Sequence, residues 1–212
     1  MRCFIALDMP GDVKEAVGSV IEKVRPAVRG VRWVTPHTLH LTLKFLGEIR
    51  EETVPEIRRT LSAVCSRHRP FSLAVRGTGA FPSLKRPGVV WAGIGESEEL
   101  AALYRDIDDS LEALGFGKEG RKFSPHLTMG RVKERTGKVV LDKELATFRD
   151  TFFGTIEAKE ILLMKSDLKP AGAEYATIAG FALNNEAHAA APAGETGGIS
   201  PESAAAAAEG GM

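Results

Sequence analysis

The tetrapeptide His-Leu-Thr-Leu occupies residues 40–43, and a near copy, His-Leu-Thr-Met, occupies residues 126–129. Each copy lies in an apolar run of the kind that forms a strand. Successive side chains of a strand point to opposite faces, so each copy presents an imidazole and a hydroxyl on one face and two apolar side chains on the other. The repetition, with a strand-helix stretch before each copy, indicates an internal duplication around one cleft.

Such a cleft has the groups that a displacement at phosphorus needs. One neutral imidazole can take a proton from an attacking water, and one protonated imidazole can give a proton to the departing oxygen, which makes His40 and His126 the candidate catalytic pair. Thr42 and Thr128 would donate hydrogen bonds to the non-bridging oxygens. Neither motif has carboxylates or cysteines at metal-ligand spacing, so we expect no catalytic metal and no cofactor.

Two basic residues near the motifs are candidate substrate contacts. Strand alternation places Lys44 on the face of His40. Arg131 has the wrong parity for the face of His126 unless Gly130 permits a bulge, which a glycine within a strand often marks. Of the two, a guanidinium fits phosphate better than an ammonium group.

Three aromatic residues are candidates for stacking on a base: Phe81, Trp91 and Phe123. Trp91 lies within an apolar strand, and core packing is the alternative interpretation that we favour for it. Phe123, which precedes the second motif, is retained as a candidate substrate contact.

The composition excludes a globally basic nucleic-acid binder, since Lys plus Arg and Asp plus Glu both total 28. Any contact with a polyanion must therefore be local. The N-terminal apolar run is short and no stretch is long enough to span a bilayer, so we expect a cytoplasmic protein without a membrane partner. The two cysteines, Cys3 and Cys65, are far apart and predicted to be reduced.

Periodicity and turn residues give the order of elements. They predict strands over residues 2–8, 31–34, 39–46, 71–81, 89–94, 123–132, 154–166 and 173–183, and helices over residues 12–28, 51–65, 98–114 and 143–148. This mixture of hairpins and crossovers favours an α+β fold over a doubly wound parallel sheet. Residues 184–212 have almost no large apolar side chain and are predicted to be a disordered tail after a domain that covers residues 1–183.

The residues around the motifs resemble a known family. The segments that carry the resemblance are Trp33 to Pro36, Leu39 to Gly47, Phe81-Pro82, Arg86-Pro87, Val90-Trp91 and Phe123 to Arg131. Over residues 1–183 the chain is similar to the RNA 2′,3′-cyclic phosphodiesterases of the two-histidine (2H) phosphoesterase superfamily, also called 2′-5′ RNA ligases, which share the HXTX motif.

The resemblance implies a bilobal fold with two pseudo-symmetric, antiparallel-rich sheets and outer helices, in which each lobe contributes one motif strand to a central cleft. It implies hydrolysis of RNA 2′,3′-cyclic phosphate ends to 2′-phosphates without a metal, and also the reverse 2′-5′ ligation. His40 would be the proton donor and His126 the acceptor, although the two motifs are too alike for the sequence itself to assign these roles. The expected partners are RNA or oligonucleotide ends and cyclic nucleotides, and we expect a monomer.

A second hypothesis is a nucleotide-binding or RNA-end-binding module that keeps the cleft but does not catalyse a reaction. The presence of two complete motifs argues against it. The sequence does not distinguish a tRNA half, an oligonucleotide or a small cyclic phosphate as the natural substrate.

Overall fold

The computed structural model describes residues 1–133, 139, 141–169 and 172–184. Its strands are β1 (Arg2–Asp8), β2 (Val31–Trp33), β3 (His40–Glu48), β4 (Phe71–Ser83), β5 (Arg86–Ile94), β6 (His126–Val132), β7 (Phe152–Ala158), β8 (Glu160–Lys169) and β9 (Gly172–Ala182). The helices are α1 (Gly11–Val24), α2 (Val54–Cys65), α3 (Glu98–Glu112) and α4 (Asp142–Ala146), with short 3-10 turns η1 (Pro36–Thr38) and η2 (Glu51–Thr53). None of these helices is long and apolar enough to cross a membrane.

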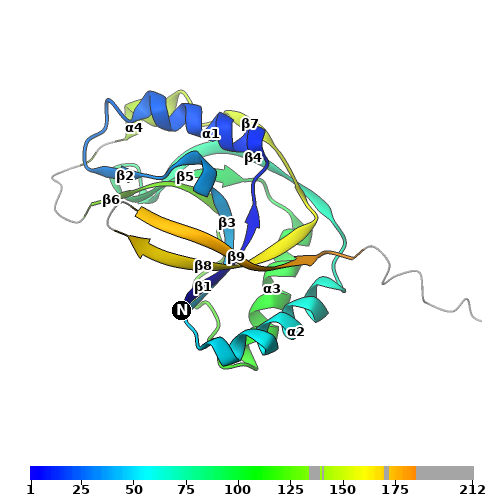
Figure 1. Ribbon diagram of the computed structural model, residues 1–212. Coiled ribbons are helices and arrows are strands. Elements are labelled where there is room, and N and C mark those ends of the chain that lie inside the picture. Colours follow the sequence, from blue (N-terminus) through cyan, green and yellow to red (C-terminus); the bar gives the residue numbers. More distant parts are fainter. Residues whose placement is uncertain (134–138, 140, 170–171, 185–212) are drawn as a thin grey trace, which may run out of the picture.

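The strands form one antiparallel sheet in the order β7-β4-β5-β6-β3-β1-β8-β9, with β2 paired to β6 (Figure 1). The motif strands β6 and β3 lie at its centre, and each leads outward to three further strands. Within the described residues, a single residue pair, Leu41 with Leu127, joins the two halves. The structure therefore confirms the α+β class and the two-lobed arrangement, with the two expected sheets continuous through their motif strands.

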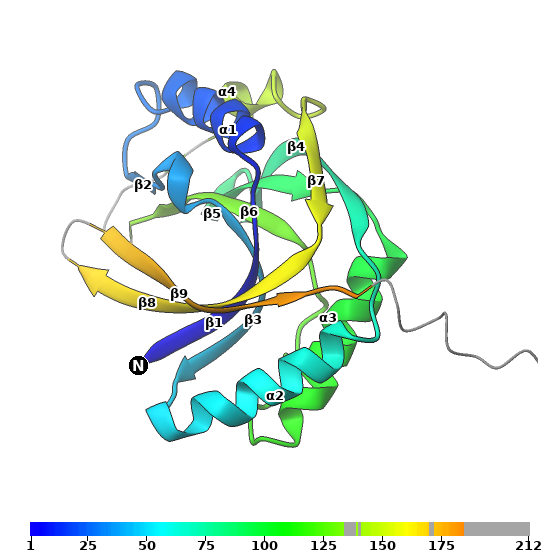
Figure 2. The ribbon, with the colours of Figure 1, turned by 45° about the vertical axis from the view of Figure 1, so that its right-hand side comes forward.

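The helices form two groups on different sides of the curved sheet. Figures 1 and 2 show α1 and α4 at one end of the molecule and α2 and α3 at the other. Helix α1 packs against β7, whereas α2 packs against α3 and β9. The three longer helices, α1, α2 and α3, each bury one apolar stripe, as α1 does with Val13, Val17 and Ile21 at helical spacing.

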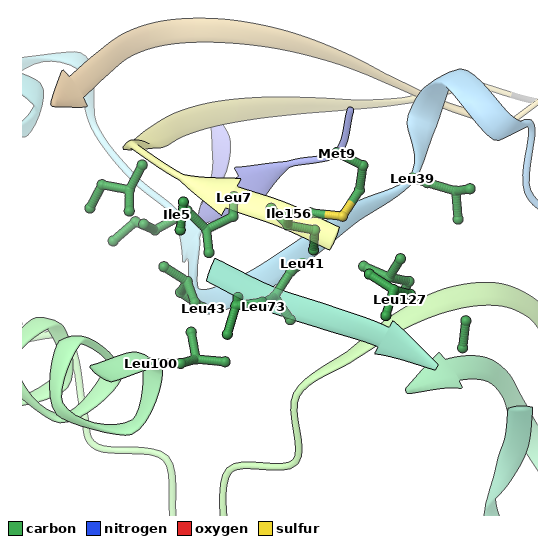
Figure 3. Packing of buried hydrophobic residues seen from close by; sticks show 14 of the residues in the cluster. Ile5, Leu7, Met9, Leu39, Leu41, Leu43, Leu73, Leu100, Leu127 and Ile156 are labelled. Carbon is green, nitrogen blue, oxygen red and sulfur yellow. The ribbon is translucent and has the colours of Figure 1, made fainter. Parts of the chain in front are cut away.

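The apolar faces of the motif strands lie in the hydrophobic core. Leu41, Leu43 and Leu127 are at most 2% exposed, and they pack with Ile5 and Leu7 of β1 (Figure 3). Burying each of these side chains stabilises the fold by about 1.5–3 kcal/mol. The histidine face of the same strands is thus held in place from behind by the core.

Most predicted elements are present, but one strand was predicted wrongly. The stretch predicted as one strand over residues 154–166 is divided at Lys159 into β7, which pairs with β4, and β8, which pairs with β1. The chain crosses here from one half of the sheet to the other. No glycine or proline follows Gly154 before the end of β8, so the sequence has no signal for the break. Residues 185–212, which belong to the predicted tail, lie outside the described residues.

Candidate active site

The first motif strand has a bulge directly after its histidine and threonine. Thr42 pairs with Ala6, and the next pair along β1 joins Ile5 to Lys44. Leu43 is therefore an extra residue without a partner on β1. An extra residue reverses the alternation of all that follows it. Lys44 consequently lies on the core side together with Ile5.

This bulge overturns the prediction that Lys44 shares the face of His40. Lys44 is only 2% exposed, its ammonium group forms an ion pair with Asp108 of α3, and it donates a 2.9 Å hydrogen bond to the carbonyl oxygen of Gly117. The alternation fails because Leu43, between Thr42 and Lys44, has no partner on β1. Lys44 links β3 to α3, and its ammonium group lies on the core side, away from the face of His40.

The second motif strand has a bulge at the matching position. The pairing of β6 with β5 skips Met129, between Thr128 and Gly130. Because of this extra residue, Gly130 lies on the core side of β6 and Arg131 lies on the same face as His126. The bulge that Arg131 required is therefore present, one residue earlier than Gly130, the position at which we expected it.

The two imidazoles are held in the same way. His40 Nδ1 lies 2.8 Å from the carbonyl oxygen of Thr38, and His126 Nδ1 lies 2.7 Å from that of Ser124. A carbonyl oxygen only accepts, so Nδ1 carries the proton in both rings. In the neutral ring Nε2 is then left without a proton, as a base requires, and on protonation it becomes an acid.

An aromatic ring meets each imidazole edge to face. The rings of His40 and Tyr175 have centroids 5.0 Å apart and planes at 82°, and His126 and Phe81 have the same separation and angle. Phe4 adds a second contact to His40, at 4.8 Å. Sequence reasoning missed Tyr175, whose one signal is that it is one of two aromatic residues in a strand made mostly of small residues.

Burial lowers the pKa of both imidazoles, because a low-dielectric surrounding disfavours the charged ring. The nearby positive charge of Arg131 lowers both pKa values further. The carboxylate of Asp8 acts in the opposite direction, on the pKa of His40. In the free protein, these effects favour the uncharged form of both imidazoles at neutral pH.

The pairing of the motifs brings four functional groups onto one surface. The antiparallel register through their central leucines places His40 beside Thr128 and His126 beside Thr42. Both threonines are half-buried. In the described part of the chain, neither hydroxyl has a hydrogen-bond partner. An anion between the imidazoles would find both hydroxyls available to donate.

This paired arrangement agrees with the comparison with known families. The family model described as LigT like Phosphoesterase matches residues 7–91 and 94–175, which include both motifs. The chain belongs to the LigT-like phosphoesterase family. Among the relatives of this phosphoesterase is a protein of Methanocaldococcus jannaschii named RNA 2′,3′-cyclic phosphodiesterase, 36% identical over 84% of this chain and 98% of the relative. A protein of the same name from Archaeoglobus fulgidus is also 36% identical, over 85% of this chain and 99% of the relative.

Solved structures show the same fold. The protein TT0787 of Thermus thermophilus superposes with a TM-score of 0.72 at 33% identity, covering 86% of this phosphoesterase and 98% of that chain. E. coli LigT complexed with 3′-AMP superposes with a TM-score of 0.66 at 25% identity, covering 86% and 97% of the two chains. The two-lobed architecture is thus shared with a relative that binds a nucleotide.

A cavity of about 530 Å³ opens beside His40 in the phosphoesterase. Its walls come from β1, α1, η1, β3, β8 and β9, and include Asp8, Lys14, Met164 and Tyr175. Lys14 Nζ lies 2.7 Å from Asp8 Oδ1, so these two charges in the cavity wall are paired. The cavity has room for a ligand group next to the imidazole.

Phe123, a candidate substrate contact, lies before β6 and against α3. Its ring stacks on Tyr104 of α3, with centroids 3.9 Å apart and planes at 9°, so one of its faces is already covered. Phe81, in contrast, contacts both His126 and Trp91, the latter at a centroid distance of 5.3 Å. Phe81 is therefore the aromatic side chain beside the second histidine.

Metal-ligand sets and reactive thiols are the other groups that could carry chemistry. Among the described residues, no group of three or more His, Cys, Asp or Glu side chains is arranged to hold a metal ion. Both cysteines are buried thiols, and burial raises the pKa of Cys65 to about 12. The two motif strands are the part of the described chain where paired acid-base groups converge.

Proposed function

We propose that this phosphoesterase hydrolyses 2′,3′-cyclic phosphate ends of RNA to 2′-phosphates, by acid-base catalysis from His40 and His126. One observation carries the proposal: the two imidazoles have the same Nδ1–H tautomer and stand on one surface, with a threonine hydroxyl beside each. The names of the relatives from Methanocaldococcus jannaschii and Archaeoglobus fulgidus support the choice of substrate.

The reaction needs two proton transfers and one displacement. Water attacks phosphorus and gives a proton to Nε2 of His126, while the bond from phosphorus to the ribose 3′ oxygen breaks. His40 gives the proton on its Nε2 to that oxygen, which leaves as a 3′ hydroxyl and leaves the phosphate on the 2′ oxygen. Such assistance is typically worth about 10²- to 10⁴-fold for each group.

The roles that we propose for the two histidines rest on a carboxylate that acts on His40 and not on His126. Asp8 lies directly opposite His40 on β1, whereas the residue opposite His126 on β5 is Gly93. A carboxylate stabilises an imidazolium, and Asp8 raises the pKa of His40. This favours His40 as the protonated member of the pair, and hence as the proton donor.

Charge builds on the non-bridging oxygens during the displacement. In this proposal the hydroxyls of Thr42 and Thr128 donate hydrogen bonds to these oxygens. Arg131 lies on the same face, near enough to both imidazoles to lower their pKa values, and its guanidinium suits an anion with two oxygens. Because a ribose 5′ hydroxyl can take the place of the attacking water, ligation to a 2′-5′ linkage would use the same groups at the same site.

Purified protein incubated with an oligonucleotide that ends in a 2′,3′-cyclic phosphate tests the proposal. We expect conversion to the 2′-phosphate, unchanged by EDTA and identified by mass and by resistance to a 3′-specific phosphatase. Absence of turnover with tight binding of the product would favour a binding module. Turnover abolished by EDTA would contradict the mechanism.

A further inference from the structure

Two arginines face each other directly across neighbouring strands next to the motif surface. Arg32 of β2 pairs with Arg131 of β6. Both side chains are exposed. In the part of the chain that the structure describes, neither guanidinium has a hydrogen-bond or ion-pair partner.

The environment of Gly130 shows which face Arg32 occupies. A Cβ atom built on Gly130 would lie 2.7 Å from Val31 Cγ1 and 3.0 Å from Trp33 Cε3, so these two side chains crowd the core side of Gly130. Arg32 stands between them in a strand and must point the other way. That is the face to which the bulge returns Arg131.

Like charges directly opposite each other on a sheet are destabilising. Among the described residues no carboxylate pairs with Arg32 or Arg131, so the two guanidinium groups repel each other there, and a bound anion would relieve this repulsion. The charge of Arg131 lowers the pKa values of both imidazoles and of the Tyr175 hydroxyl. Arg32 shifts none of these pKa values and lies one strand beyond, so it suits a second anionic group farther from the reacting phosphorus.

We propose that Arg32 binds the phosphodiester that precedes the terminal nucleotide, and thereby makes this protein select RNA ends over free mononucleoside 2′,3′-cyclic phosphates. The inference rests on the proposed function, in which Arg131 contacts the reacting phosphate. A guanidinium binds two phosphate oxygens at once, which an exposed ammonium group does less well. An RNA chain supplies the second phosphate, whereas a mononucleotide has none.

The test compares two substrates that differ by this phosphate: a dinucleotide with a 2′,3′-cyclic end and the corresponding mononucleoside cyclic phosphate. We expect Arg32→Ala to reduce kcat/KM for the dinucleotide by on the order of tenfold. The value of kcat/KM for the mononucleotide should not change. A dinucleotide with a neutral methylphosphonate linkage should show the same loss with the unmodified protein and no further loss with Arg32→Ala. Arg58→Ala, an exposed arginine on α2, is the matched control and should change neither substrate.

Binding of the 2′-phosphate products, measured by calorimetry, separates this inference from the proposed function. The role of Arg32 is supported if Arg32→Ala weakens binding of the dinucleotide product and leaves binding of the mononucleotide product unchanged. This holds even if no turnover is detected. Equal losses for both ligands, or no loss for either, would overturn it. Arg32→Lys and the melting temperature of each variant show whether a loss comes from the missing guanidinium or from unfolding.

Discussion

Leu41 and Leu127 pair directly across β3 and β6, and both side chains are fully buried. Because each is the second residue of its motif, this pair lies at the centre of the approximate two-fold symmetry that relates the two lobes. The histidine before each leucine and the threonine after it stand on the opposite face. The spacing of the motif histidines and threonines therefore depends on how the two leucines pack in the core.

Leu127→Ala should destabilise the protein and weaken catalysis together. Removing this fully buried side chain leaves a cavity and is expected to cost about 2–5 kcal/mol in the free energy of unfolding. The activity of the folded fraction should also fall, since the strand that positions His126 loses its support. Urea denaturation and kcat measured well below the unfolding transition check the two effects. Phe152→Ala, at an exposed aromatic residue, should cost less than about 1 kcal/mol and should not alter kcat.

His40→Ala and His126→Ala should each reduce kcat by about 10²- to 10⁴-fold. The double variant should lose little more than the worse single variant, because the two groups act in one concerted displacement. His68→Ala is the control, since His68 binds Asp106 at 2.9 Å beside α2 and lies outside the motifs. Full activity in either single motif variant would contradict the paired-histidine mechanism.

The sequence predicted the motif face but not the surface beyond it. Alternation is a local property of the chain, so His40 and Thr42 could be placed on one face from their spacing alone. A bulge depends on what the neighbouring strand pairs with, and the sequence of a single strand does not contain that information. The positions of the bulges at Leu43 and Met129 could therefore not be predicted from the sequence. The prediction that Lys44 shares the face of His40 was wrong for this reason.

Tyr175 and Asp8 could not be predicted for a related reason. Tyr175 lies on β9 and Asp8 on β1, and both reach His40 only through pairings between strands that are distant in sequence. Short motifs do not report such contacts. The roles proposed for the motif residues remain predictions until the variants are measured.

The buried pair of Lys44 and Asp108 should matter for stability but not for chemistry. Lys44→Met leaves the carboxylate of Asp108 buried without its partner, which is expected to cost about 3–5 kcal/mol in the free energy of unfolding. The double variant with Asp108→Leu should recover much of this loss, because no unpaired charge remains. Its kcat should equal that of the unmodified protein, since Lys44 lies on the core side of β3.

The activity of this double variant also tests whether Lys44 takes part in the reaction. A double variant that is stable but inactive would show that the ammonium group contributes to the reaction after all. Guanidinium denaturation gives the free energy of unfolding of this variant, and steady-state kinetics on the cyclic substrate give its kcat.

The activity of the protein should follow a bell-shaped pH profile whose two limbs respond to different variants. With His40 as the acid, its deprotonation ends activity at high pH, and protonation of His126 ends it at low pH. Burial lowers both pKa values, so the optimum of kcat/KM should fall below about pH 6.5, the ordinary value for histidine.

Asp8 and Lys14 make the assignment of the roles testable, because they shift the pKa of His40 in opposite directions and are not among the groups that shift that of His126. Asp8→Asn removes the charge that raises the pKa of His40, so the alkaline limb of kcat/KM should move to lower pH. Lys14→Met removes a charge that lowers this pKa, so the same limb should move to higher pH, while the acid limb stays fixed. Both shifts should be below about one pH unit, since both residues are partly exposed and solvent screens them. If the acid limb moves instead, His40 is the base and His126 the acid.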